Sequence, residues 1–307
     1  MTRARKTQWF TALAMTLAAG WMFKIFLFDF SPLPPTSTYP LDLDRLRSLA
    51  GDRDLPLRVN SVRIADGAFP EYVVVAGGNR TPVPMAWQTF QVVYADKTVI
   101  IDPAQDRARH QAFKFAGAYH DEGWDSMQTA LARASLILVT AEHWDHLAGV
   151  TASANVELLL PHLLLNEKQL ENTTLLEEAG LDAGMRAKVQ SLAYEGAHAV
   201  APGMVLLPAP GHTQGSQMIY VRLQDAEELL FVGDVVWSTL NLERRAGHSR
   251  LVANLSGEDR ERMADQTRAL VDLGEHAERG RVHLLIAHDG ALTDELIAAG
   301  IVGDKLE

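Results

Sequence analysis

The sequence predicts an α/β fold in which buried strands alternate with helices, and three observations lead to this. Four short apolar runs have the length and composition of buried strands, whereas the polar stretches 166–179 and 256–273 are typical of outer helices. Ser256, with two acidic residues close behind it, resembles a helix start. The part of the chain after residue 40, about 265 residues, suits one large domain of packed layers.

The amino terminus predicts a membrane segment. Arg3, Arg5 and Lys6 precede a mainly apolar stretch, 9–28, whose only charge is Lys24. A bilayer span needs about 20 mainly apolar residues, and flanking basic residues stay in the cytoplasm. Residues 1–30 are therefore predicted to be a membrane anchor or uncleaved signal of a single-pass cell-membrane protein, with the body of the chain on the extracytoplasmic (periplasmic) side. The alternatives are a cleaved signal peptide and a helix that packs on the domain.

Composition limits the remaining possibilities. Residues 31–40 are rich in proline and are expected to form an extended linker, which leaves 41–307 as the globular domain. The chain has no cysteine, so disulfides and thiolate ligands are excluded. Its net charge of -11 argues against nucleic acid as a partner, because such binding depends on Lys and Arg.

The most informative segment is 140–146, Thr-Ala-Glu-His-Trp-Asp-His, which follows the apolar run 136–139. His143, Asp145 and His146 thus fall within four positions at the end of a predicted strand. Imidazole and carboxylate together suit Zn²⁺ and similar divalent ions, and one turn can aim their lone pairs at a common point. The alternative is a solvated turn in which Asp145 caps the next helix.

Three further predicted strands end in residues of the same kinds. The run 204–210 leads into Gly-His212-Thr-Gln-Gly-Ser, the run 229–232 into Gly233-Asp234, and the run 282–286 into Ala-His288-Asp. Side chains at the carboxyl ends of neighbouring strands meet at one edge of a sheet. The sequence therefore predicts one metal site built from four strand ends.

In these residues the chain resembles the metallo-β-lactamase-fold hydrolase superfamily, and its lactonase-like members in particular. That family carries HxHxDH at a strand end, a His in a PGHTxGS-like loop, an Asp in a Gly-Asp pair and a last His after another strand. The resemblance covers about residues 90–289 and begins with a hairpin of strands 90–94 and 98–102. It implies a four-layer αββα sandwich of two mixed β-sheets flanked by helices.

The resemblance also implies two adjoining positions for a divalent metal, with Zn²⁺ as the expected ion. Asp234 bridges the two, and Asp145 both binds metal and orients the attacking hydroxide. The implied metal ligands are His143, Asp145, His146, His212, Asp234 and His288.

One departure from the family pattern affects the first of these positions. The first His of HxHxDH falls at Ala141, which leaves His143, His212 and the bridging Asp234, so this position should bind its ion less tightly. Glu142 is the nearest substitute, although alternation along a strand turns its side chain away. The other candidates to fill the gap are His110 and His120, for which an exposed surface position is favoured.

Several neighbouring residues have two interpretations each. Asp102 either holds a ligand His or forms a turn before a proline, and Asp289 caps a helix or supports a ligand. Thr213 and Ser216 either shape a tight turn or offer hydrogen-bond donors to a substrate. Trp144 and Trp237 line a substrate pocket or pack in the core. The other histidines are interpreted as ordinary packing or surface residues: His162, His198, His248, His276 and His283.

A site of this kind predicts hydrolysis. A divalent ion lowers the pKa of bound water to about 7 and polarises a carbonyl or phosphoryl oxygen. We expect a metal-dependent hydrolase of a small-molecule substrate, a lactone or carboxylic ester first and a β-lactam or phosphodiester second. A degenerate relative that binds a ligand without turnover is the alternative that Ala141 keeps open. Segment 239–255 is expected to be a solvated loop; the alternative is that it overhangs the pocket, where its basic residues would receive an acidic group of the substrate.

Overall fold

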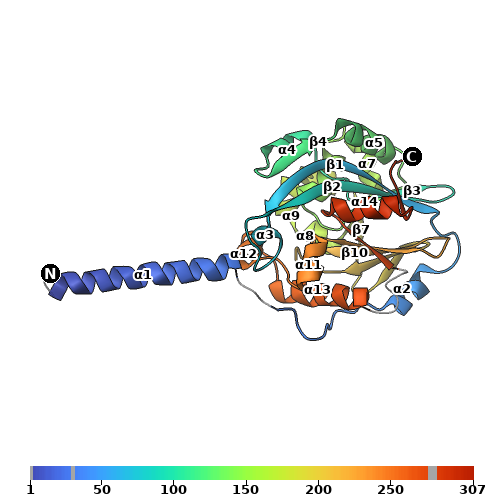
Figure 1. The fold of residues 1–307 in the computed structure, drawn as a ribbon. Helices are drawn as coiled ribbons and strands as arrows, with labels where there is room; N and C mark the ends of the chain where they lie inside the picture. Colours follow the sequence, from blue (N-terminus) through green and yellow to red (C-terminus); the bar gives the residue numbers. More distant parts are fainter. Residues whose placement is uncertain (1–2, 29–31, 276–281) are drawn as a thin grey trace.

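The protein is described by a computed structural model that covers residues 3–28, 32–275 and 282–307. Two β-sheets face each other and helices cover their outer faces, so the predicted four-layer αββα order is confirmed (Figure 1). The larger sheet consists of β1 (Arg58–Pro70), β2 (Pro82–Val93), β3 (Thr98–Ile101), β4 (Ala116–Tyr119), β5 (Leu136–Leu138), β6 (Leu163–Asn166), β7 (Gln190–Leu192) and β13 (Val302–Gly303). The smaller sheet consists of β8 (His198–Ala201), β9 (Met204–Pro208), β10 (Gln217–Arg222), β11 (Glu228–Gly233) and β12 (Val282–Ile286).

Both sheets are mixed. In the larger sheet the order is β13-β1-β2-β3-β5-β6-β7, with β4 paired to β1; β3, β5, β6 and β7 run parallel, while β1, β2 and β3 are antiparallel. In the smaller sheet, ordered β12-β11-β10-β9-β8, only β11 and β12 are parallel. The predicted hairpin is confirmed as β2 and β3, although β2 begins eight residues earlier than the 90–94 strand expected from sequence.

Helices connect and cover these strands. They are α1 (Arg3–Phe28), α2 (Leu43–Ala50), α3 (Glu71–Val74), α4 (Arg107–Ala112), α5 (Asp121–Leu131), α6 (Trp144–Thr151), α7 (Val156–Leu159), the 3₁₀ turn η1 (Leu160–His162), α8 (Glu167–Glu171), α9 (Thr173–Glu178), α10 (Ala183–Arg186), α11 (Thr239–Arg244), α12 (Arg250–Ser256), α13 (Arg260–Glu275) and α14 (Gly290–Ala298). Segment 239–255, expected as a loop, is instead mostly α11 and α12. Ser256 ends α12 and does not start the following helix.

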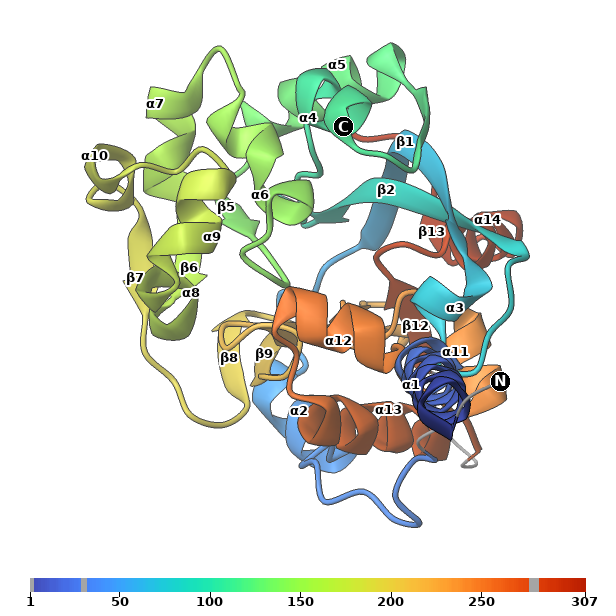
Figure 2. The same cartoon turned by 90° about the vertical axis from the view of Figure 1, so that its left-hand side faces the viewer.

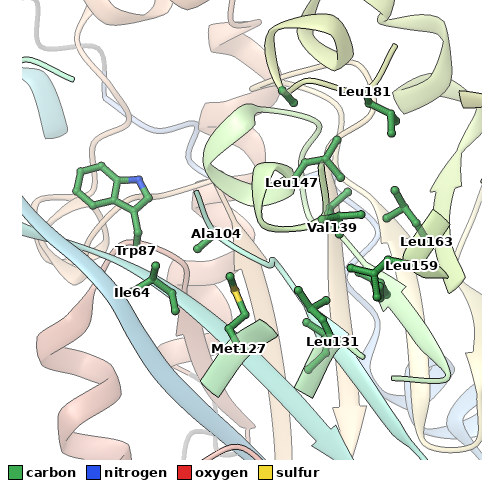
Figure 3. Packing of buried hydrophobic residues seen from close by; sticks show 14 of the residues in the cluster. Ile64, Trp87, Ala104, Met127, Leu131, Val139, Leu147, Leu159, Leu163 and Leu181 are labelled. Carbon is green, nitrogen blue, oxygen red and sulfur yellow. The ribbon is translucent and has the colours of Figure 1, made fainter. Parts of the chain in front are cut away.

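Among the described residues, the three largest parts of the hydrophobic core correspond to the three interfaces between the four layers. Between the sheets, Phe90 of β2 meets Phe231 of β11 edge to face, with ring centroids 5.2 Å apart. On the outer face of the larger sheet, helices α5 and α6 bury residues such as Met127 and Leu147 (Figure 3). On the outer face of the smaller sheet, α2 and α13 do the same, with Leu270 fully buried. Burial of apolar area on this scale is the main force that holds the layers together.

The amino-terminal helix α1 projects away from the body, with contacts to α3 and α12 near its carboxyl end (Figures 1 and 2). Large apolar side chains on it, including Trp9 and Phe10, are exposed. Within the described parts of the chain, no helix combines the length and apolar character that a membrane crossing requires, so the predicted transmembrane helix is not supported.

The proline-rich segment that follows lies against the body. Residues 32–40 contain no helix or strand, as expected, but Ser37 and Thr38 bond to Asp265 of α13, and the Tyr39 hydroxyl donates to the Pro208 carbonyl. This segment is therefore docked on the domain surface. The domain boundaries at residues 30 and 40 stay predictions.

Helix α6 must approach the β3–α4 loop closely, and Gly149 allows it. A Cβ at this position would lie 1.8 Å from the Pro103 carbonyl oxygen and 2.9 Å from Met127 Cε.

Gly149→Ala should therefore lower the free energy of unfolding by about 1–3 kcal/mol, the usual cost of overpacking, as measured by urea denaturation. Gly274→Ala in α13 is the control: nothing lies within 4 Å of its Cβ position, and helix propensity favours alanine by up to about 1 kcal/mol. Equal stability of the two variants would contradict this close packing.

Candidate metal centre

The six predicted ligands come together at one edge of the two sheets, contributed by four chain segments. His143 directly precedes α6, whose first turn carries Asp145 and His146. The other three follow strands of the smaller sheet: His212 lies in the loop after β9, Asp234 directly after β11 and His288 two residues after β12. The carboxyl ends of these strands meet at the same edge, which is why residues far apart in sequence converge.

Asp234 is the centre of this cluster. Its Oδ2 lies 3.0 Å from Nε2 of His146 and 3.0 Å from Nε2 of His212, and its Oδ1 lies 3.0 Å from Nε2 of His288. His143 completes one side, with Nδ1 3.0 Å from His212 Nε2. Asp145 completes the other, with Oδ2 3.7 Å from His288 Nε2. The two sides form two groups of metal-binding atoms that share Asp234.

The ring nitrogens that face away from the centre have their own partners. His146 Nδ1 lies 3.2 Å from Asp102 Oδ2, which confirms the supporting role predicted for Asp102. His288 Nδ1 lies 3.1 Å from the Ala86 carbonyl oxygen, to which it can donate. Each contact leaves Nε2 as the nitrogen with a free lone pair, directed to Asp234.

Asp145 does not cap α6, because no side chain bonds to the amides at that helix start. Its Oδ2 instead accepts a hydrogen bond from Trp87 Nε1 at 3.1 Å. The Asp145 side chain is 18% exposed, whereas that of Asp234 is 3% exposed. Asp145 is thus the carboxylate of the cluster that solvent or a small molecule can reach.

The backbone before Asp234 needs a glycine. Gly233 has φ of +54°, and a Cβ there would lie 2.7 Å from Thr140 Cβ. Thr140 itself holds the neighbouring segment, since its amide and hydroxyl both donate to Asp102 at 2.7 Å. The Gly-Asp pair therefore brings β11 close to the end of β5 and sets Asp234 beside His146.

The geometry of this cluster fits a divalent cation. Asp234 Oδ1 is buried and makes no hydrogen bond, although His288 Nε2 is 3.0 Å away, so the two atoms are near each other without hydrogen-bond alignment. Nδ1 of His143 and Nε2 of His212 also lie only 3.0 Å apart, although both are ring nitrogens that can bind a metal. Lone pairs gathered in this way are expected around a shared ion, and a His and Asp donor set suits zinc.

Electrostatics of the cluster without an ion show how strongly it attracts positive charge. Burial opposes protonation of His212, but the carboxylates of Asp234 and Glu258 outweigh it and raise the pKa of His212 to about 10. Burial and the nearby His212 lower the pKa of His143 to about 4. Despite burial, the surrounding imidazoles hold the pKa of Asp234 well below its usual value. A cation that enters must therefore displace protons.

Among the residues that the structure describes, none takes the place of the histidine missing at position 141. Ala141 is fully buried, and Glu142 turns away, as alternation predicted, to bond Asn172 and Thr213. His110 is buried against Gln105, so the surface position expected for it was wrong. Within the described residues, the first group therefore offers three side-chain ligands: His143, His212 and Asp234.

The other supporting residues mostly follow the simpler interpretation. Thr213 donates to Glu142 at 2.7 Å and lies 2.8 Å from the Ser216 hydroxyl, so both hydroxyls shape the loop. Burial raises the pKa of Glu142, and the Thr213 hydrogen bond partly opposes this. Asp289 caps α14 and also accepts from Thr239. His120 pairs with Asp66 away from the cluster, and His276 lies outside the described residues.

Two residues next to the cluster, Glu258 and His248, were not predicted from the sequence. Glu258 accepts hydrogen bonds from His212 and from His248, which had been interpreted as an ordinary packing or surface residue. Trp237 lies beside both, with its ring centroid 4.1 Å from that of His248 and 6.2 Å from that of His212. Proximity of Trp237 to Asp234 in the sequence was the one available signal; nothing local marked Glu258.

The fold is that of known hydrolases, although sequence comparison finds no relative. No protein-family model matches the chain, and no curated protein sequence matches it either. Solved structures do match. A mutant of B. thuringiensis AiiA with N-decanoyl-L-homoserine bound at its active site has a TM-score of 0.61 at 13% identity, over 78% of this chain and 96% of that chain.

Two further structures match at TM-scores of 0.51. The hydrolase AbOPH of the β-lactamase superfamily is 14% identical over 76% of this chain and 87% of its own. AidC, a dizinc quorum-quenching lactonase in complex with the product N-hexanoyl-L-homoserine, is 16% identical over 74% of this chain and 86% of its own. The chain therefore has the metallo-β-lactamase fold.

The shared position of Asp234 yields a prediction about metal content. Asp234→Ala should remove both ions, whereas His143→Ala should remove only the first and Asp145→Ala only the second. Elemental analysis after dialysis against Zn²⁺ measures the metal-to-protein ratio. His283→Ala is the control, since His283 bonds Glu227 away from the cluster. An unchanged ratio in Asp234→Ala would show that the cluster does not hold metal in this way.

Proposed function

We propose that the protein is a zinc-dependent hydrolase whose substrate is a lactone or a carboxylic ester. The observation that carries this proposal is the convergence of three imidazoles on the Asp234 carboxylate, with His143 and Asp145 completing the two sides, in a metallo-β-lactamase fold. Buried charges of this kind are costly unless they are paired or bind metal.

The two groups of ligands are unequal, and this supports a catalytic role. The second group has four side chains with Asp234 included, which is enough to close a tetrahedral site. The first has three, because residue 141 is alanine. Catalytic zinc sites keep three protein ligands and an open position. When bound, the ion supplies an activated water near neutral pH and polarises the carbonyl of the substrate.

The residues of the chain orient and protect this chemistry. Asp145 is reachable from solvent and is fixed by the Trp87 indole, so it is placed to hold and pass the proton of an attacking water. Asp102 and the Ala86 carbonyl keep two imidazoles in fixed orientation. Preorganised groups of this kind lower the barrier because they need not reorient during the reaction.

Aromatic rings beside the cluster favour a substrate with an apolar part. Trp237 lies 6.3 Å from His288, between ring centroids, and 5.6 Å from Phe69. Phe113 links Phe69, at 5.6 Å, to Trp144, at 5.8 Å. Phe113, Trp144 and Trp237 are partly buried and Phe69 is buried, and aromatic rings beside a few polar groups are typical of small-molecule sites.

Two arguments support the proposed class of substrate: the aromatic rings beside the cluster, and the similarity of the fold to that of the matched structures. The net charge of -11 disfavours polyanions such as nucleic acid, which weakens the case for a phosphodiester substrate. Two of the matched structures hold N-acyl homoserine molecules. An acylated lactone would match both the aromatic surface and a centre that acts on carbonyl groups.

The test is a hydrolysis panel of lactones, carboxylic esters, β-lactams and phosphodiesters with the zinc-loaded protein. Turnover of lactones or esters is expected, with loss on chelation and recovery when Zn²⁺ returns. Asp145→Asn should lower kcat by about 10²–10⁴-fold, the usual contribution of a proton-transfer group. His283→Gln serves as the control and should keep full activity.

Two outcomes would reject this proposal. A protein that holds zinc firmly but hydrolyses none of the panel would be the ligand-binding relative. Turnover confined to β-lactams or phosphodiesters would replace the substrate class while leaving the metal centre in place.

A further inference from the structure

His212 is the ligand with the least help from regular structure. His146 lies in the first turn of α6 and His288 between β12 and α14, whereas His212 lies in the loop after β9. The backbone of that loop is held from the side of α13, where the Asp259 amide donates to the Gly211 carbonyl at 2.8 Å. This bond fixes the position of the loop but leaves the orientation of the His212 ring to other contacts.

Glu258 provides that contact. Its Oε1 lies 2.8 Å from His212 Nδ1 and 2.9 Å from His248 Nδ1, so one oxygen accepts from two rings. The Glu258 side chain is 1% exposed. A buried carboxylate group thus accepts from both rings beside the metal centre.

His248 is placed to hold Glu258. Its side chain is 1% exposed and stacks against Trp237, with ring centroids 4.1 Å apart. Its other nitrogen, Nε2, is buried and has no hydrogen-bond partner among the residues that the structure describes. The polar contact that His248 does make is the one to Glu258.

Glu258 is positioned by the end of α12, which it follows by two residues. Gly257 follows this helix with φ of +73°, a left-handed conformation that glycine adopts without strain, and the Glu258 amide donates to the Ala253 carbonyl at 2.8 Å. The next residue, Asp259, bonds the Gly211 backbone. Two adjacent residues therefore hold this loop: Glu258 holds the His212 ring, and Asp259 holds the backbone at Gly211.

We propose that Glu258 is a positioning residue for the first metal position, braced by His248. It accepts the Nδ1 proton of His212 and so keeps Nε2 as the nitrogen that faces Asp234 and His143. This inference rests on the proposed metal centre and extends it to two residues that do not touch the ion.

The first position should depend on this contact more than the second does. It has three side-chain ligands because Ala141 contributes none, so loss of a well-oriented His212 leaves His143 and the shared Asp234. Acceptors that orient a metal-binding histidine commonly contribute 10–100-fold to affinity. The second position keeps all four of its side chains whatever happens at Glu258.

The experiment compares two replacements at Glu258 by titrating metal-free protein with Zn²⁺ in competition with a chromophoric chelator. Glu258→Met keeps the volume and removes the acceptor, and it should weaken the first ion by about 10–100-fold while the second is unchanged. Glu258→Gln keeps a neutral acceptor and should restore part of that loss. Glu228→Met is the matched control, because Glu228 is also buried and paired, with Arg47, at the opposite end of β11 from Asp234.

A second measurement does not depend on metal. The Nδ1 proton of His212 should give a slowly exchanging imidazole resonance in the metal-free protein, which Glu258→Met should abolish and Glu228→Met should leave. If Glu258→Met does not fold, His248→Phe takes its place: it keeps the ring against Trp237, removes one donor to Glu258 and should weaken the first ion alone.

The outcomes separate this inference from the proposed function. Wild-type protein that binds no zinc would reject the metal centre, and the His212 resonance would then decide the role of Glu258 alone. Full affinity for both ions and an unchanged resonance in Glu258→Met would overturn the positioning role. Equal weakening of both ions would do the same, because it would indicate a general loss of structure.

Discussion

The buried carboxylate of Asp234 is the constraint on which the rest of the structure depends. An unpaired charge in an apolar interior is unstable, and breaking such a pairing usually costs several kcal/mol. Here imidazole nitrogens lie within 3.0 Å of both oxygens. Each of those imidazoles must in turn be oriented through its other nitrogen. The need to satisfy one carboxylate therefore extends outward to Asp102, the Ala86 carbonyl and Glu258, and through them to both sheets.

The packing between the sheets makes this arrangement possible. Phe90 of β2 and Phe231 of β11 meet edge to face in the inter-sheet core, so their contact joins the two sheets. At the ligand edge the same two sheets approach each other through Gly233, where any side chain would meet Thr140. Apolar packing thus sets the distance between the sheets. The polar cluster lies at the edge where β9, β11 and β12 end.

Much of the centre was predictable because the relevant residues stand at strand ends, where an apolar run followed by His or Asp is a local signal. The supporting role of Asp102 was predictable too, but that of Glu258 was not, since the residues that bond Glu258 lie 10 and 46 positions away from it and share no local pattern. Strand β1 was missed as well. Its 13 residues include polar and small side chains and a register shift between Arg63 and Ala65, so they lack the strict alternation by which a strand is recognised.

Because Ala141 offers no ligand, the first position depends more strongly on the orientation of its three remaining side chains. In a complete four-ligand position, a poorly oriented loop histidine would be one of several, and the others would hold the ion. With three ligands, the orientation of each one decides whether the position binds at all. The His212 loop is held accordingly at two points. Thr213 donates to Glu142, and His212 bonds Glu258. If the first position holds an ion as proposed, its three oriented ligands would leave room for water to exchange with substrate, whereas a closed site would have to give up a ligand first.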